Sequence, residues 1–421
     1  MHRNEKIYYW YSAFADLVIL TPIIVLYLTA KGLSFTEILL IDSILAIAIF
    51  AFEVPTGALA DKLGRKWCLV LGGILCCISL FIYIIGNRFA VFAFAEVLFG
   101  FGAAFKSGAD SALIYDSLKL RQQEDRYLKV EGKARSFALY TLAFGSITAG
   151  FAYEINIHLP LIISIGFIAM SVLFALCFEE KQVGVESEQE TLSDSKMPTF
   201  TMSASPMRAY FNQIRESGSY AVRHPKLRSV ILFTMLFYTF YRAGFWYVQP
   251  YMEAVHIPVS YFGITFFVFN IAAAYASKRS HDFINWTKSR TLGVLGGLLI
   301  VSYVFIASLH IWVGVLFILL QQFAKGFYRP VTSKYMNKYI PSDKRATVLS
   351  FQSLCSNLTV ALILPIMGVL KDKSDIFTAH WILAIVMGLL LAVLMRYMNK
   401  HMSSSSTTQL TVEEPKEELQ G

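Results

Sequence analysis

Charge is the first thing that this sequence lacks. Only 16% of its 421 residues are Asp, Glu, Lys or Arg, and 56% are hydrophobic, whereas a soluble domain carries about 25% charged residues. A globular core cannot hide so much apolar surface from water. This composition excludes a water-soluble domain and indicates that lipid surrounds most of the chain.

Cysteine is also scarce, and the motifs of several enzyme classes are missing. None of the five cysteines has metal-ligand spacing, so we expect reduced, packed thiols and no metal site. The chain contains no phosphate-binding glycine loop followed by Lys-Ser/Thr, no His-Glu-x-x-His and no Gly-x-Ser-x-Gly. We therefore expect neither an enzyme nor a cofactor, and no ATP-driven pump.

Long apolar runs are abundant instead. A membrane-spanning helix needs about 20 mostly apolar residues. The first run is too long for a signal-peptide core and contains Asp16, so we interpret it as a retained span. About twelve spans are predicted, in two groups of six, at residues 7–29, 36–58, 67–86, 91–117, 133–154, 159–178, 227–250, 258–277, 290–308, 312–335, 346–369 and 377–396.

Basic residues mark one set of loops. The formal charge of +8 comes largely from Lys and Arg in short loops between the apolar runs, which is a topology signal and not a nucleic-acid surface. We therefore expect no nucleic-acid partner, a multi-pass protein of the inner membrane, and both termini in the cytoplasm. The predicted units are a six-helix bundle at 1–178, a cytoplasmic linker at 179–226 with an amphipathic surface helix at 206–223, a second bundle at 227–400 and a disordered tail at 401–421.

The loop between the second and third spans carries the most specific motif. The run Gly57-Ala58-Leu59-Ala60-Asp61-Lys62-Leu63-Gly64-Arg65-Lys66 matches G-x-L-a-D-[RK]-x-G-R-[KR]. It resembles motif A of the major facilitator superfamily. Within that superfamily, the chain resembles the bacterial drug/proton antiporters. The resemblance implies an all-α membrane fold of two pseudo-symmetric six-helix bundles, which works as a monomer and binds a small molecule.

In related transporters this loop latches the two halves together on the cytoplasmic side. We expect the same role for Gly57, Asp61, Gly64, Arg65 and Asp116, with Asp61 docking at residues 345–347. Gly57 would let a helix approach closely, and Gly64 would permit the turn. The matching segment of the second half, 276–283, has lost the glycines, so the latch is expected to be asymmetric. The alternative is that these charges only set the topology.

Ionisable residues inside spans are functional hypotheses by default because burying them costs several kcal/mol. Asp16, Glu53 and Asp110 are the residues predicted to carry protons. A plain interhelical hydrogen bond for Asp16 and a bracing role for Glu53 stay open. Asp42 lies nearer the outer side of its span.

A second set is predicted to bind substrate. Lys106 and Asp110 are four residues apart, as are Lys325 and Arg329, so each pair shares a helix face. The family fold would bring these four residues toward one cavity. Three of them are cations and one is an anion, so the cavity would be positively charged, and Arg242 would add to that charge. Tyr241 and Trp246 would line the cavity beside Arg242. The alternatives are a structural ion-pair network and ordinary aromatic packing.

Three functions remain open. The first is proton-coupled, alternating-access efflux of a small drug-like molecule; the second is proton-coupled uptake of an anionic or zwitterionic metabolite. The third is a membrane receptor on a transporter scaffold. The segment 145–152 has part of the glycine pattern of antiporter motif C but lacks its proline.

Overall fold

The computed structural model describes residues 3–180, Arg215, 218–340 and 345–402. The predicted amphipathic helix at 206–223 and the tail therefore lie largely outside the described residues. Of that helix, Arg215 and residues 218–223 are described, and they are helical. The described part of the chain holds helices and no strand. This confirms the all-α fold class.

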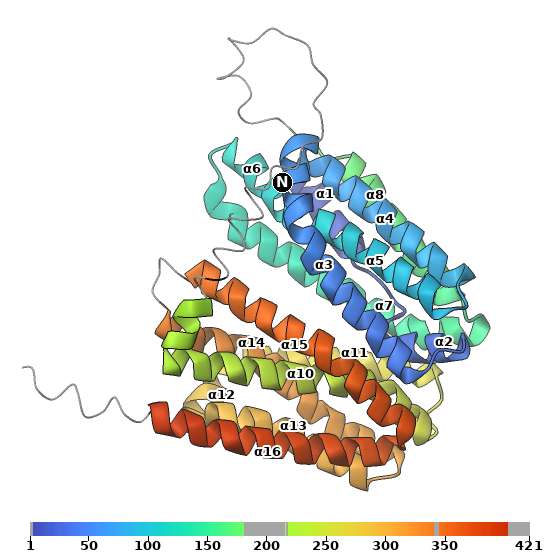
Figure 1. The fold of residues 1–421 in the computed structure, drawn as a ribbon. Helices are drawn as coiled ribbons and strands as arrows, with labels where there is room; N and C mark the ends of the chain where they lie inside the picture. The colour runs from blue at the N-terminus through green and yellow to red at the C-terminus, as the bar shows by residue number, and fades with distance from the viewer. Residues whose placement is uncertain (1–2, 181–214, 216–217, 341–344, 403–421) are drawn as a thin grey trace, which may run out of the picture.

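The helices occur in two groups (Figure 1). The first half contains α1 (Arg3–Phe14), η1 (Thr21–Ile23), α2 (Ile24–Ala30), α3 (Phe35–Leu63), α4 (Arg65–Ile85), α5 (Phe89–Lys106), α6 (Ala109–Lys119), η2 (Glu124–Arg126), α7 (Tyr127–Ile155) and α8 (Leu159–Leu176). The second half contains α10 (Pro225–Ala254), α11 (Ser260–Lys278), α12 (Ser280–Thr287), η3 (Lys288–Arg290), α13 (Thr291–Ser308), η4 (Trp312–Gly314), α14 (Val315–Tyr339), α15 (Arg345–Lys373) and α16 (Ile376–Met402).

Each predicted span corresponds to helix, but the first and fourth spans are broken. The first is divided between α1 and α2, with Pro22 in the short helix η1 between them. The fourth is divided between α5 and α6 at Gly108, whose φ of 75° is in the left-handed region that favours glycine. Proline lacks the N–H that a continuous helix needs. The predicted spans at 7–29 and 91–117 are therefore interrupted helices, although Phe89–Lys119 as a whole is long and apolar enough to cross a membrane.

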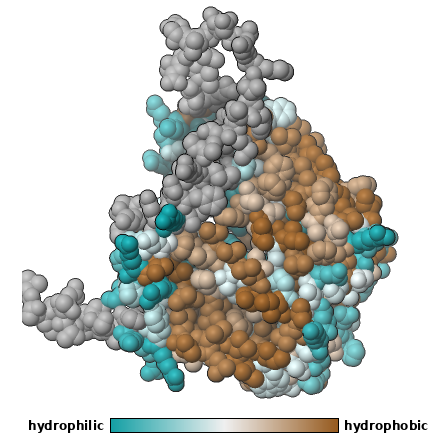
Figure 2. Space-filling view, viewed as in Figure 1, coloured by the Kyte–Doolittle hydropathy of each residue, from teal (hydrophilic) through white to brown (hydrophobic). Residues whose placement is uncertain are grey.

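In the part of the chain that the structure describes, eight helical segments are long and apolar enough to cross a membrane: Phe35–Glu53, Arg65–Ile85, Phe89–Lys119, Leu159–Leu176, Ser260–Lys278, Ser280–Ser308, Thr347–Lys373 and Ile376–Lys400. Their outward faces expose large apolar side chains such as Phe81, Leu173, Leu362 and Leu389. Figure 2 shows hydrophobic residues over most of the visible face of both groups. Such a face suits contact with lipid chains.

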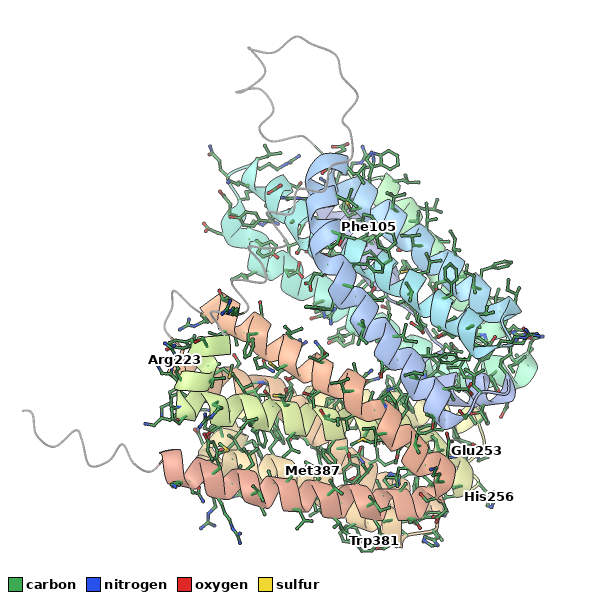
Figure 3. The ribbon with its side chains drawn as sticks, in the orientation of Figure 1. Phe105, Arg223, Glu253, His256, Trp381 and Met387 are labelled. Atoms are coloured by element: carbon green, nitrogen blue, oxygen red, sulfur yellow. The ribbon has the colours of Figure 1, made fainter. Side chains whose placement is uncertain are left out.

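The two halves touch at one side only of the described structure. We call this the closed side; it holds the end of α7 and the starts of α3 and α11, and Figure 3 labels Glu253 and His256 there, with Arg223 at the far end of the second half. One hydrophobic core, which includes Ile23 and Phe237, contains residues of both halves.

Away from the closed side each half packs its own separate core. One of these cores includes Tyr11 and Leu113, and the other Leu227 and Met336. Figure 1 shows the two groups of helices meeting near α2 and diverging toward α6 and the start of α15. We call this diverging side the open side.

Glycines let the halves approach closely at the closed side. A Cβ on Gly263 of α11 would lie 2.0 Å from the Ser146 carbonyl oxygen of α7, and a Cβ on Gly150 would lie 2.2 Å from the Val259 carbonyl oxygen. Real Cβ atoms do not approach this closely, so any side chain here would force the helices apart. The contact between α7 and α11 depends on these glycines.

Candidate functional site

A charged pocket of about 350 Å³ lies in the first half, between α1, the α5–α6 break and α7. Its charged lining residues are Asp16, Lys106, Asp110, Glu131 and Arg135. Three carboxylates and two cations give it a formal charge of −1. Tyr8 and Tyr11 add buried rings to its wall.

Lys106 is the most deeply buried charge of this pocket. Its side chain is 9% exposed, and its Nζ donates to Asp16 Oδ1 at 2.7 Å and to the Ala15 carbonyl at 2.9 Å. That carbonyl is available because α1 ends at Phe14. The carbon stem fits because Gly72 has no side chain: a Cβ there would lie 2.7 Å from Lys106 Cγ.

Lys106 and Asp110 form no ion pair and do not share one continuous helix face, contrary to what their spacing predicted. The i, i+4 rule assumes one continuous helix, and the chain breaks at Gly108 between the two residues. Asp110 instead accepts a hydrogen bond from the Ser111 N–H at 2.7 Å. Its carboxylate faces the pocket without a salt bridge to any described cation.

Glu131 and Arg135 of α7 line the pocket but were missed by the sequence reasoning. Tyr8 Oη donates to Glu131 Oε2 at 2.5 Å. Arg135 lies inside the predicted span 133–154, so the same rule that selected Asp16 could have found it. Glu131 is four residues earlier on the same helix face. No signal in the sequence selected Tyr8.

Arg242 lies at the closed side and joins the two halves. Its Nη2 donates to both carboxylate oxygens of Asp42, at 2.7 and 2.6 Å, and Trp246 Nε1 donates to Asp42 Oδ2 at 3.1 Å. Asp42 is 10% exposed and Arg242 is 27% exposed. The expected positive excess at Arg242 is wrong, because Asp42 of α3 neutralises it.

The predicted residues of α14 stay apart from the first-half pocket. Lys325 Nζ lies 6.0 Å from the ring centroid of Tyr241 in α10, a cation–π arrangement. Arg329 is exposed. Neither of these cations lines the pocket with Lys106 and Asp110, so the four residues do not meet in one cavity in this conformation.

Two carboxylates cap helices across the closed side. Asp372, near the end of α15, accepts from the N–H groups of Phe35 and Thr36, the first residues of α3, at 3.0 and 2.8 Å. Glu154, near the end of α7, accepts from the Ser260 N–H that begins α11, at 3.0 Å. The first N–H groups of a helix have no partner within it and attract negative charge. Each half thus caps a helix of the other.

Gln249 of α10 also joins the two halves at the closed side, by hydrogen bonds to the backbone at the break in the first span. Its Oε1 accepts from the Val25 N–H at 2.8 Å, and its Nε2 donates to the Thr21 carbonyl at 3.0 Å. Gln249 is fully buried. One amide side chain of the second half therefore satisfies a donor and an acceptor that the broken helix leaves open.

The loop motif is partly described. Gly64 has a φ of 87°, as the predicted turn requires. Arg65 Nη1 donates to Asp116 and to the Ala112 carbonyl, and Glu180 accepts from the Arg65 N–H at 2.7 Å. These contacts lie within the first half. The Asp61 side chain and residues 341–344 lie outside the described part of the structure.

Gly57 and Glu53 show no contact of the kind that was expected. Among the described residues, a Cβ on Gly57 would meet nothing within 4 Å, so the close helix approach expected there stays a prediction for the conformation in which the open side is closed. Glu53 is exposed. Both residues lie on the part of α3 that is nearest the open side.

The latch role of Asp61 stays a prediction. We expect Asp61→Asn to reduce transport to background while insertion into the membrane stays normal, because the carboxylate would dock on the second half only when the open side closes. Transport and membrane content are compared with Asp61→Glu, which keeps the charge. Wild-type transport by Asp61→Asn would contradict the latch.

Within the described ranges no three His, Cys, Asp or Glu side chains lie close enough to hold a metal ion. All five cysteines lie in the described ranges, and none of them forms a disulfide.

The fold and the pocket define a polytopic helical membrane protein made of two halves. A family model described as Major Facilitator Superfamily matches residues 11–310 and 231–418. The chain belongs to this superfamily, and the predicted membership is confirmed.

Two curated relatives match part of the chain. An uncharacterized MFS-type transporter of Bacillus subtilis (strain 168), YxaM, is 28% identical over 176 residues, 41% of this chain and 41% of that protein. The quinolone resistance protein NorA of Staphylococcus aureus (strain Mu50 / ATCC 700699) is 24% identical over 185 residues, 42% of this chain and 47% of that protein. The matched region spans less than half the length of either relative.

Solved structures match almost the whole chain. The nucleoside transporter NupG has a TM-score of 0.72 at 15% identity, over 94% of this chain and 98% of that one. A bacterial homolog to the human lysosomal transporter Spinster, in an inward-facing and unoccupied conformation, has a TM-score of 0.66 at 15% identity, over 94% and 96%. Likeness at this identity shows the fold.

Proposed function

We propose that this protein is a secondary active transporter that works by alternating access and exports a small drug-like molecule in exchange for protons. It would act as a monomer in the inner membrane, with both termini in the cytoplasm. The observation that carries this proposal is the asymmetry of the contacts between the halves: they share a core and cross-half bonds at one side, and pack separately at the other. A charged pocket lies in the first half.

The loops rich in Lys and Arg support placing the open side in the cytoplasm. The described conformation would then be inward-facing. The name of the quinolone resistance relative supports export of drug-like compounds.

The charge of the pocket supports a substrate with a positive group. Asp16, Asp110 and Glu131 outnumber Lys106 and Arg135, and Lys106 is already paired with Asp16. Uptake of an anionic metabolite has less support, because Lys106 and Arg242 both have carboxylate partners. The cations Lys325 and Arg329 would suit the anionic end of a zwitterion.

The test is a flux assay in proteoliposomes with an imposed pH gradient. A lipophilic cationic dye should be transported against its gradient, and a protonophore should abolish this transport. A set of carboxylates and of zwitterions is tested in parallel. Dye transport that is unaffected by the protonophore, or driven uptake of carboxylates alone, would contradict the proposal.

Glu131 is predicted to contribute to binding of the cationic substrate. We expect Glu131→Gln to weaken dye binding by about tenfold to a hundredfold, since a hydrogen bond to a charged group contributes about 1.5–3 kcal/mol. Lys325→Ala, on the other half, is the matched control and should leave dye affinity near that of the wild type. Equal losses in the two variants would argue against a binding role for the first-half pocket. Equilibrium binding of the dye to purified protein measures both.

A further inference from the structure

Glu96 of α5 is a buried carboxyl group that the proposed site does not use. Its side chain is 8% exposed, and it lies in a segment that is apolar enough to cross the membrane. Tyr83 Oη of α4 donates to Glu96 Oε1, while Glu96 Oε2 is buried and has no hydrogen-bond partner.

Glu96 has no cation beside it to balance a negative charge. The titratable groups that face it are Tyr83 and Cys76 on α4 and Asp42 on α3. None of the described salt bridges includes it. A buried carboxylate with a free oxygen and no cation costs several kcal/mol, so the neutral acid is the form that this site favours.

The position of Glu96 connects it to the contact between the halves. Asp42 and Glu96 each lie seven residues after the first residue of their helices, Phe35 and Phe89, which both begin at the closed side. The helices α3 and α5 pack closely, since a Cβ on Gly100 would lie 2.8 Å from Ala48 Cβ. With Gly100 opposite Ala48, Glu96 lies about two residues, or about 3 Å along the helix axis, from the level of Asp42. The two carboxyl groups are close enough to interact.

The partner of Asp42 comes from the other half. In this conformation Arg242 holds both oxygens of Asp42. If the closed side opened, Arg242 would move away with the second half and leave two neighbouring carboxyl groups. Two neighbouring carboxylates repel each other, which raises the free energy of the doubly charged state, so one of them takes up a proton.

We propose that Glu96 is a proton-binding site of this transporter, loaded from the closed side when the halves separate there. This inference rests on the proposed function for its coupling role. The step is a proton transfer from a hydronium ion to a Glu96 carboxylate oxygen, which leaves water and the neutral acid, and the reverse transfer to water releases the proton. Tyr83 positions the carboxyl group, and Asp42 sets its electrostatic surroundings.

Infrared spectroscopy of the purified wild-type protein tests proton binding without any transport assay. The carbonyl band of a protonated carboxyl group should be present at neutral pH, and Glu96→Gln should lose it. Asp110→Asn is the matched control. A band that Glu96→Gln leaves unchanged would overturn the inference, even in a protein that transports none of the compounds tested.

Flux measurements test coupling. Glu96→Gln mimics the neutral acid, so we expect dye exchange without a pH gradient to stay within about twofold of the wild type, while gradient-driven transport falls at least tenfold. Gradient-driven transport that persists in Glu96→Gln would overturn the coupling role and leave the proposed function standing. Net accumulation of dye by the wild type that does not depend on the pH gradient would instead refute proton-coupled export.

Tyr83→Phe provides a second variant with a different signature. The Tyr83 hydroxyl donates to the carboxyl group and so favours its charged form. Without this donor the proton is held more tightly, and the pH profile of transport should move to higher pH. A purely structural role for Tyr83 would lower the transport rate at every pH without moving the profile.

Discussion

Gly263→Ala should hold the closed side apart and reduce transport to a small fraction of the wild-type rate. The added Cβ would lie 2.0 Å from the Ser146 carbonyl oxygen and 2.9 Å from that of Ile147. Both are backbone atoms, so no side-chain rotation relieves the contact. Overpacking costs about 1–3 kcal/mol, which corresponds to a shift of about 5- to 150-fold in the balance between the two conformations.

Distances between spin labels measure this shift. Labels at Arg88 and Lys373, which are exposed residues of the two halves near the closed side, should move apart in Gly263→Ala. The labels are introduced after replacement of the native cysteines.

Two further variants make the glycine test specific. Gly150→Ala should behave like Gly263→Ala, since its Cβ would lie 2.2 Å from the Val259 carbonyl oxygen. Gly388→Ala of α16 is the matched control, because a Cβ there meets nothing within 4 Å. If Gly263→Ala has wild-type transport and unchanged label distances, the close contact between α7 and α11 does not influence the balance between the two conformations.

The helices and their grouping could be predicted because the membrane imposes simple rules on sequence. A span must be apolar for about 20 residues, and charged loops mark where each span ends. The breaks in the first and fourth spans were harder to predict. Pro22 and Gly108 can disrupt a helix, but each lies inside an apolar run that is long enough to be predicted as a single span.

The partners of the charged residues depend on which helices meet. Asp16 and Lys106 are 90 positions apart, and Asp42 and Arg242 are 200 apart. No local spacing rule connects them. The caps at Asp372 and Glu154 could not be predicted for the same reason, since both depend on how the end of one half lies against the other. Asp16, Lys106, Asp110 and Arg242 were selected because they are ionisable residues inside predicted spans. The i, i+4 spacing then misled the prediction for Lys106 and Asp110, because their helix breaks at Gly108.

Asp42→Asn and Arg242→Gln should each destabilise the closed side. The pair is mostly buried, and Asp42 accepts three hydrogen bonds from Arg242 and Trp246. Truncating one partner of a buried, hydrogen-bonded charge pair costs about 2–5 kcal/mol, much of it from the charge left behind. Since Arg242 is about a quarter exposed, the lower half of this range applies. We expect transport to fall at least tenfold and the labels at Arg88 and Lys373 to move apart.

The exchanged pair Asp42→Arg/Arg242→Asp separates the ion pair from the other roles of its members. If the pair fastens the two halves, the exchange should restore a large part of the closed population that each single change loses. Arg3→Gln is the matched control, because its partner Glu179 lies just after α8 and the pair does not join the two halves. Both side chains are more than half exposed, so the loss of this pair should cost less than about 1 kcal/mol. If Asp42→Asn and Arg242→Gln both leave the label distances unchanged, the ion pair does not keep the two halves together at the closed side. If each single variant shifts the label distances but the exchanged pair does not restore them, the effect comes from the other contacts of each residue and not from the ion pair. Trp246 is then the first residue to test, because it also donates to Asp42.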